Sequence, residues 1–258
     1  MKIKLKKQNL IFEFQRKLEE IINLDERINR LKKDMNNGDV SPFFISLFGE
    51  EMTLNVKLGQ SLQTAFGMSF YEQVCKILGE SVGFKVLHQE KVLGFINDKI
   101  HKYLDENLED INYIPNREDE IKKIRELSTP GPKKEDPDST VDVYIITPEK
   151  KEILIDITTV KPNKKSFRAM KRKLLKWTAM RFSQDIKADV NAYIAIPYNP
   201  QSKDPAGTNY NLWSEYYDKK DLLVGDDLWK LVSNNTFGIK DIIKVFEKIG
   251  EKTLKKEI

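Results

Sequence analysis

The stretch "EILIDITTVKPNKK" at residues 152–165 decides the fold, because it combines a strand pattern with a charge that buried strands rarely carry. Its run of apolar and β-branched residues predicts a strand, and Asp156 lies in the middle of that run. A cluster of lysines begins at Lys161, where the apolar run stops. The chain therefore places a carboxylate inside a strand with several cations close behind it.

The residues on both sides of this stretch predict a mixed β-sheet. A second β-rich run at 140–147 is joined to 152–160 by the turn "PEKK", which predicts a hairpin. A long helix over 166–188 and a third strand over 191–199 follow. Two strands, a helix and a further strand predict an α/β fold with a central mixed sheet flanked by helices.

The rest of the chain has mostly helical patterns. Residues 8–35 predict an amphipathic helix broken near Asn23, and a second helix is expected from Ser69, where Ser69 and Glu72 form an S-x-x-E capping box. A short strand at 84–89, helices over 93–109 and 118–127, and a helical tail over 207–258 complete the prediction. We expect a helical N-terminal region at 1–60, a core at 61–205 and a helical C-terminal region at 206–258, together forming one compact unit.

Composition restricts the class of protein. A charged fraction of 33% and a net charge of +4 over 258 residues are typical of a soluble, mildly basic protein, and do not by themselves indicate a nucleic-acid partner. The single cysteine, Cys75, excludes an internal disulfide and favours a reducing, cytoplasmic location. No apolar run approaches the roughly 20 residues of a membrane span, so no membrane partner is expected.

Asp142 and Asp156 are the candidate catalytic residues. In a hairpin that turns at 148–151 they lie about equally far from the turn, so their carboxylates can converge. Two adjacent carboxylates repel each other unless a cation lies between them, and Mg²⁺ prefers such oxygen ligands. A bound Mg²⁺ can polarise a phosphoryl oxygen and activate water. The alternative is that both acids are edge-strand charges that face solvent.

The two acids and a nearby lysine resemble the PD-(D/E)xK nuclease signature. More specifically, four stretches resemble the TdeIII-type family of type II restriction endonucleases: "GMSFYEQ" (67–73), "DITTVKPN" (156–163), "IPYNP" (196–200) and the segment 224–250. The resemblance implies a restriction-endonuclease-like core that uses Mg²⁺ to cut both strands of a short palindromic DNA site, of the GGNCC kind. It also implies a companion DNA methyltransferase, and a homodimer follows because two active sites would match the two-fold symmetry of a palindrome.

The sequence departs from this signature at the lysine. The signature places lysine two residues after the second acid, and that position is Thr158, whose hydroxyl can hold a water but carries no charge. Lys161 is the nearest substitute, although its odd spacing from Asp156 directs it to the opposite face unless the chain bends at Pro162. Three alternatives follow: Lys161 reaches the site, the enzyme works with Thr158, or a change at 158 has inactivated the chain.

The helix after the strand is a candidate DNA-binding surface. Arg168, Arg172 and Lys176 recur every four residues and therefore share one face. No acid occurs between Asp156 and Asp185, which leaves this positive charge without local partners and favours contact with phosphates over a solvated face. Further cations add to the same charge: Lys164, Lys165, Lys171, Lys173 and Arg181.

Three other residues have two interpretations each. Tyr198 and Asn199 in "IPYNP" either contact DNA or form an ordinary Asn-Pro turn. Glu72 either caps its helix or, as the resemblance implies, joins the acidic cluster.

Two functions compete with restriction. A repair or structure-specific nuclease on the same core would cut DNA without a defined sequence. A catalytically decayed DNA-binding protein, suggested by Thr158, would bind duplex DNA and leave it intact.

Overall fold

The structure is a computed structural model that describes residues 2–65, 70–110, 112–158 and 161–254. It divides into two compact units, one formed by Met1–Val74 with Asp241–Ile258 and the other by Cys75–Lys240. The helices are α1 (Lys2–Ile22), α2 (Leu24–Asn36), α3 (Pro42–Ala65), α4 (Phe70–Ser81), α5 (Asp98–Glu109), α6 (Arg117–Leu127), α7 (Lys164–Gln184), α8 (Asp226–Val232) and α9 (Ile239–Leu254). The strands are β1 (Lys85–Lys91), β2 (Thr140–Ile146), β3 (Glu152–Ile157), β4 (Val190–Ile196) and β5 (Leu222–Val224).

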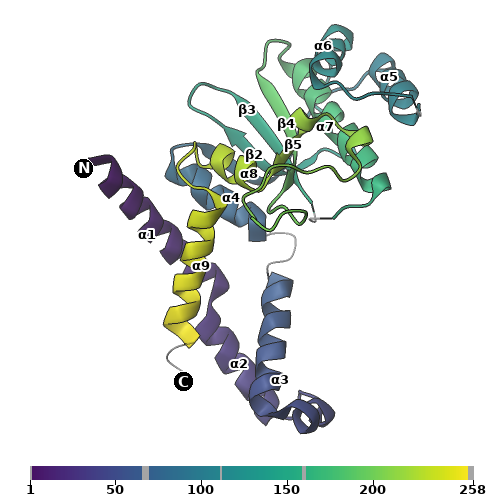
Figure 1. Ribbon diagram of the computed structural model, residues 1–258. Coiled ribbons are helices and arrows are strands. Elements are labelled where there is room, and N and C mark those ends of the chain that lie inside the picture. The colour runs from purple at the N-terminus through teal and green to yellow at the C-terminus, as the bar shows by residue number, and fades with distance from the viewer. Residues whose placement is uncertain (1, 66–69, 111, 159–160, 255–258) are drawn as a thin grey trace. The chain divides into compact units, whose positions relative to one another are not determined.

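The second unit is built on one five-stranded mixed sheet in the order β1-β2-β3-β4-β5 (Figure 1). The first three strands pair antiparallel, and the last two pairings, β3 with β4 and β4 with β5, are parallel. The β2–β3 pair is the expected hairpin, with Val143 opposite Ile155. The helix α7 makes the crossover that a parallel β3–β4 pairing requires.

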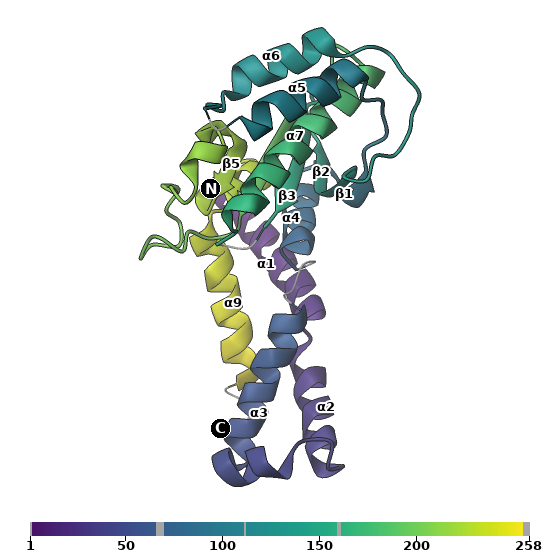
Figure 2. The ribbon, with the colours of Figure 1, turned by 90° about the vertical axis from the view of Figure 1, so that its right-hand side faces the viewer.

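The helices α5, α6 and α7 lie along one face of this sheet (Figure 2). Tyr144 and Leu154 project from the sheet into the same buried cluster as Leu174 and Trp177 of α7 and Ile100 of α5. Alternate residues of a strand share a face, so Asp142 and Asp156 belong to the face that α7 covers.

Two further helices approach β1 from its other side. A Cβ atom added at Gly79 in α4 would lie 2.6 Å from the Val86 Cγ2 atom and 3.5 Å from the carbonyl oxygen of Val232 in α8. Only glycine allows this close approach, because any side chain at Gly79 would overlap Val86.

The first unit consists of helices. Asn23, in the left-handed region at φ 43°, separates α1 from α2 as expected. Ile28 and Leu31 of α2 pack against Leu58 of α3. Gly49, at φ 75°, changes the direction of α3.

The structure confirms the α/β class and the mixed sheet expected from the sequence. It adds two elements that were not expected, α3 and the short strand β5, so the expectation of an all-helical tail over 207–258 is wrong at 222–224. Residues 206–240 belong to the unit that contains the sheet. Ser69 of the expected capping box lies outside the described residues. None of the helices in the described ranges is long and apolar enough to cross a membrane.

Candidate active site

Asp142 and Asp156 lie opposite each other on β2 and β3. The register pairs Val143 with Ile155, so one step further along the hairpin it brings the two aspartates face to face. Side chains in such directly opposed positions are neighbours on one face of the sheet. The convergence expected from the hairpin is therefore present in the structure.

The Asp142 carboxylate is held by two donors. The backbone N–H of Ile157 donates to the Oδ2 atom at 2.7 Å, and the side-chain amide of Gln89 donates to the Oδ1 atom at 3.2 Å. Gln89 lies in β1 with φ 52°, an uncommon conformation for a residue other than glycine. The hairpin and β1 thus fix the orientation of Asp142 together.

Asp156 is buried and paired with a lysine from α7. The residue is 7% exposed as a whole, and its Oδ1 atom lies 2.6 Å from the Lys173 Nζ atom. Burial raises the pKa of the Asp156 carboxyl above its ordinary value, the positive charge of Lys173 opposes this rise, and the negative charge of Asp142 adds to it. The two aspartates are therefore close enough to interact electrostatically, and Lys173 partly balances their charge.

This pair of carboxylates fits a hard divalent cation. Each carboxylate has about four lone-pair sites, so a carboxylate that accepts hydrogen bonds can also bind a metal. Mg²⁺ commonly binds through one or two carboxylates together with water and substrate phosphate. Within the described ranges, no group of three or more histidine, cysteine, aspartate and glutamate side chains is placed to hold a metal ion.

The sequence pointed to two positions for the catalytic lysine, and the structure describes both. The backbone N–H of Thr158 donates to the carbonyl of Ala195 at 3.0 Å, which continues the β3–β4 pairing past the end of β3. Lys161 is exposed and follows residues 159–160, which lie outside the described part of the chain. The roles of Thr158 and Lys161 remain predictions.

Lys173 was not among the candidate catalytic residues. The sequence does carry a signal for its position, because Lys173 lies three residues after Met170 and four before Trp177, both buried. Residues at these spacings share a helix face, so Lys173 belongs beside the stripe of α7 that packs on the sheet. Its positive charge alone groups it with the surface cations of this helix.

Several cations of α7 have acidic partners from distant parts of the chain. Arg172 pairs with Asp105 of α5 at 2.6 Å, and Lys176 pairs with Asp136 at 2.9 Å and with Asp138 at 3.1 Å. The lack of acids between positions 156 and 185 leaves these cations without local partners, as expected, but distant acids compensate Arg172 and Lys176 in the fold. The acids that balance them come from elsewhere in the fold, where sequence spacing does not reveal them.

The start of α7 differs from its middle. Asn163 caps the helix by accepting a hydrogen bond from the Ser166 backbone N–H at 2.9 Å. The Lys164 and Arg168 cations lie 5.0 and 5.3 Å from the ring centroid of Tyr216, and Lys165 is exposed. These cations form a basic surface with an aromatic ring, which suits contact with a phosphate backbone.

The remaining candidates lie in different environments. Tyr198 is 40% exposed, whereas Asn199 is buried, with its amide donating to the Asn209 carbonyl at 2.7 Å. Asn199 therefore holds its loop together and is not presented at the surface. Glu72 is buried in the first turn of α4, inside the unit that contains Met1–Val74, and its part in the acidic cluster remains a prediction.

Comparison with known proteins gives consistent matches. The model of a family described as "Type II restriction endonuclease, HinfI" matches residues 6–250. The chain is 27% identical over 208 residues to the type II restriction enzyme MjaII of Methanocaldococcus jannaschii, a match that covers 76% of this chain and 55% of MjaII. It is 20% identical over 249 residues to HgiCII and 22% identical over 245 residues to HgiEI, two type II restriction enzymes of Herpetosiphon aurantiacus. These matches cover 88% and 85% of the two enzymes.

The class expected from the sequence, type II restriction endonuclease, is confirmed, and the finer TdeIII-type assignment remains a prediction. The family match runs through the hairpin with both aspartates, the helix α7 and the rest of the sheet. This chain belongs to the HinfI family of type II restriction endonucleases.

Proposed function

We propose that this chain is a Mg²⁺-dependent, site-specific deoxyribonuclease of the PD-(D/E)xK type that hydrolyses both strands of duplex DNA. The observation that carries the proposal is the pairing of Asp142 with Asp156 on the face of the sheet that α7 covers. Membership of the HinfI family supports the same activity. A short palindromic site of the GGNCC kind, a homodimer and a companion DNA methyltransferase belong to this proposal.

In this mechanism Asp142 and Asp156 hold the cation, and the Ile157 N–H and the Gln89 amide keep Asp142 oriented. When bound, Mg²⁺ polarises a phosphoryl oxygen and lowers the pKa of a bound water. Hydrolysis forms a bond from the water oxygen to phosphorus and breaks one ester P–O bond. A proton from the water ends on the leaving oxygen, so the products are a phosphate monoester and a hydroxyl.

The test is digestion of a long duplex with Mg²⁺, followed by mapping of the cut ends. Discrete fragments with a common end sequence are expected, and chelation of the metal should abolish them. Asp142→Asn and Asp156→Asn should each lose cleavage by roughly 100-fold or more while the protein still binds duplex DNA.

Two results would favour the competing functions. Fragments without a common end sequence would indicate a repair or structure-specific nuclease. Binding without cleavage at every divalent metal concentration would indicate a decayed DNA-binding protein, which is the alternative that Thr158 in the lysine position suggests.

A further inference from the structure

We infer that Lys173 of α7 supplies the positive charge that a strand lysine would otherwise supply, and that it acts as a catalytic residue. The inference rests on the proposed nuclease function. Its Nζ atom lies 2.6 Å from Asp156, whereas the lysine position of the strand holds the uncharged Thr158. The structure therefore provides an ammonium group at the acid pair from a different element of the fold.

The surroundings of Lys173 keep this ammonium both oriented and accessible. It lies 5.0 Å from the ring centroid of Trp177, and the Trp177 indole N–H donates to the Asp138 carbonyl at 2.7 Å, which fixes the ring. The side chain of Lys173 is 24% exposed, so a phosphate can reach it from solvent.

The role follows from the charge that develops during hydrolysis. As the water oxygen bonds to phosphorus, negative charge builds up on the phosphate oxygens, and a preorganised cation stabilises this charge. Lys173 keeps its proton throughout, and the reaction balances as described above. Lys161 is exposed, and among the described residues the ion pair of Asp156 is made by Lys173.

A matched control exists on the same two elements. Arg181 of α7 pairs with Glu152 of β3 at 2.6 Å, and their side chains are 23% and 12% exposed. The side chains of Lys173 and Asp156 are 24% and 10% exposed, so the two ion pairs are buried to a similar degree. Arg181→Met and Lys173→Met therefore remove ion pairs of the same kind and burial between α7 and β3. Any loss that comes only from stability should be similar in the two variants.

The experiment measures single-turnover cleavage of a duplex with Mg²⁺, thermal unfolding, and duplex binding without metal. We expect Lys173→Met to cut roughly 100-fold more slowly or worse with duplex binding kept, whereas Arg181→Met should lose far less of the rate at a similar loss of thermal stability. The double variant Thr158→Lys/Lys173→Met, which returns an ammonium to the strand, should recover at least part of the rate. Without DNA, Lys173→Met should also need less Mg²⁺ for half of its thermal stabilisation, because one competing cation is gone.

The outcomes separate the two proposals. Should the wild type and Arg181→Met cut duplex DNA while Lys173→Met cuts at the same rate, Lys173 has no catalytic role and the nuclease proposal stands. If the wild type cuts no duplex, both proposals fail. If Lys173→Met does not fold, Lys173→Gln removes the charge while keeping a polar side chain beside Asp156, and wild-type cleavage by that variant would also overturn the inference.

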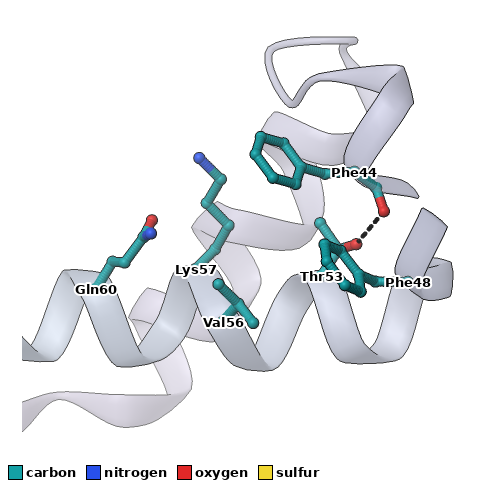
Figure 3. Close-up of a pocket in the computed structure, with 6 residues that line it drawn as sticks. All are labelled: Phe44, Phe48, Thr53, Val56, Lys57 and Gln60. Atoms are coloured by element: carbon teal, nitrogen blue, oxygen red, sulfur yellow. Dashed lines mark hydrogen bonds between the residues drawn. The ribbon is translucent and has the colours of Figure 1, made fainter. Parts of the chain in front are cut away.

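A separate observation concerns α3, whose apolar side chains lie at the surface. Three pairs at four-residue spacing are exposed: Phe43 and Leu47 (83% and 73%), Phe44 and Phe48 (52% and 42%), and Met52 and Val56 (54% and 48%). The turn at Gly49 lets Thr53 donate to the Phe44 carbonyl at 3.2 Å and joins the two arms of α3 around a shallow pocket of about 40 Å³ (Figure 3).

We propose that this apolar face of α3 binds the same face of a second copy of the chain. A fully exposed large apolar side chain has about 200 Å² of surface, so the six α3 side chains together expose on the order of 700 Å². This area is larger than the apolar patch that a typical monomer exposes. A stable interface needs about 800 Å² from each partner, so this face alone nearly suffices. Its rim carries both signs, Glu50 and Glu51 against Lys57, and a two-fold axis can bring opposite charges together.

The test is the mass of the chain in solution, which needs no nuclease activity. The wild type should have twice the 30.1 kDa of one chain, and Phe43→Ser/Leu47→Ser should have 30.1 kDa. Both substituted residues are exposed, so the double variant should fold normally. Phe12→Ser, which removes a phenylalanine that is 72% exposed on α1, should stay dimeric. A monomeric wild type or a dimeric double variant would overturn the proposal.

Discussion

At the scale of single residues, two lysines of α7 show what sequence spacing can and cannot reveal. Asp142 and Asp156 were predictable because a hairpin fixes which residues face each other across two strands. The spacing to Met170 and Trp177 indicates the face of α7 on which Lys173 lies, but its pairing with Asp156 was not predictable, since that depends on how far α7 is rotated over the sheet. Lys171 was also counted as a surface charge, yet it is fully buried between Glu120 and Asp221.

The buried Lys171 leads to a prediction on stability. Lys171→Met leaves the carboxylates of Glu120 and Asp221, each 2% exposed, without their shared cation. Loss of one partner from a buried pair costs about 3–5 kcal/mol, so the free energy of unfolding in urea should fall by about that amount. Lys220→Met, which removes an exposed pair with Glu118, should leave the urea midpoint unchanged. A similar loss in both variants would contradict the account.

At the scale of elements, helices and strands with a regular apolar pattern were predicted from the sequence. Elements that are short or that expose their apolar side chains were not predicted. The runs at 140–147 and 152–160 are rich in β-branched residues, which gave both strands of the hairpin. The strand β5 has only three residues and owes its conformation to pairing with β4, which no local pattern records. The helix α3 was not predicted because its exposed apolar residues break the usual alternation of apolar and polar faces. Gly49 also interrupts the helix.

The contact between α7 and the loop at 136–138 should depend on pH. Burial opposes ionisation of Asp136, but the hydrogen bonds from Lys176 and from the Asp138 backbone N–H outweigh it, so the Asp136 pKa lies below its ordinary value of 3.8. Because the pKa of Asp136 is lower in the folded state than in the unfolded state, its ionisation stabilises the protein above about pH 4. This stabilisation is lost as the pH falls through the pKa that Asp136 has in the folded state. Urea midpoints of the wild type and Lys176→Met should therefore converge below about pH 4. A difference that stays constant as the pH falls well below 4 would show that the pair does not couple to Asp136 ionisation.

At the scale of the whole molecule, the fold redistributes the charge that the sequence gathers on α7. Arg172 and Lys176 are balanced by α5 and by the loop at 136–138, and Arg181 is balanced by β3. Within the described residues, the cations of α7 that have no acidic partner lie at the start of the helix, at Lys164, Lys165 and Arg168. The predicted contact with DNA therefore concentrates at one end of the helix.

The salt dependence of DNA binding can test this redistribution. Lys164→Ala/Arg168→Ala should reduce the log–log slope of affinity against salt by about two, because each lost phosphate contact removes about one unit. Arg172→Ala/Lys176→Ala removes two cations that already have acidic partners, so its slope should change less. Equal reductions in the two double variants would show that the ion pairs open on binding and that the whole helix face contacts phosphates.

The pairing of Lys173 with Asp156 also bears on how such a site can change over evolutionary time. Thr158 occupies the strand position where the signature has lysine, and Lys173 reaches Asp156 from α7, so a lysine can be present at either position or at both. An ancestor with both lysines would have had two cations where one is needed, and either one would then be free to drift. The nuclease signature can thus lose its strand lysine through a sequence of active proteins, and a threonine at 158 need not mark a lineage in decay.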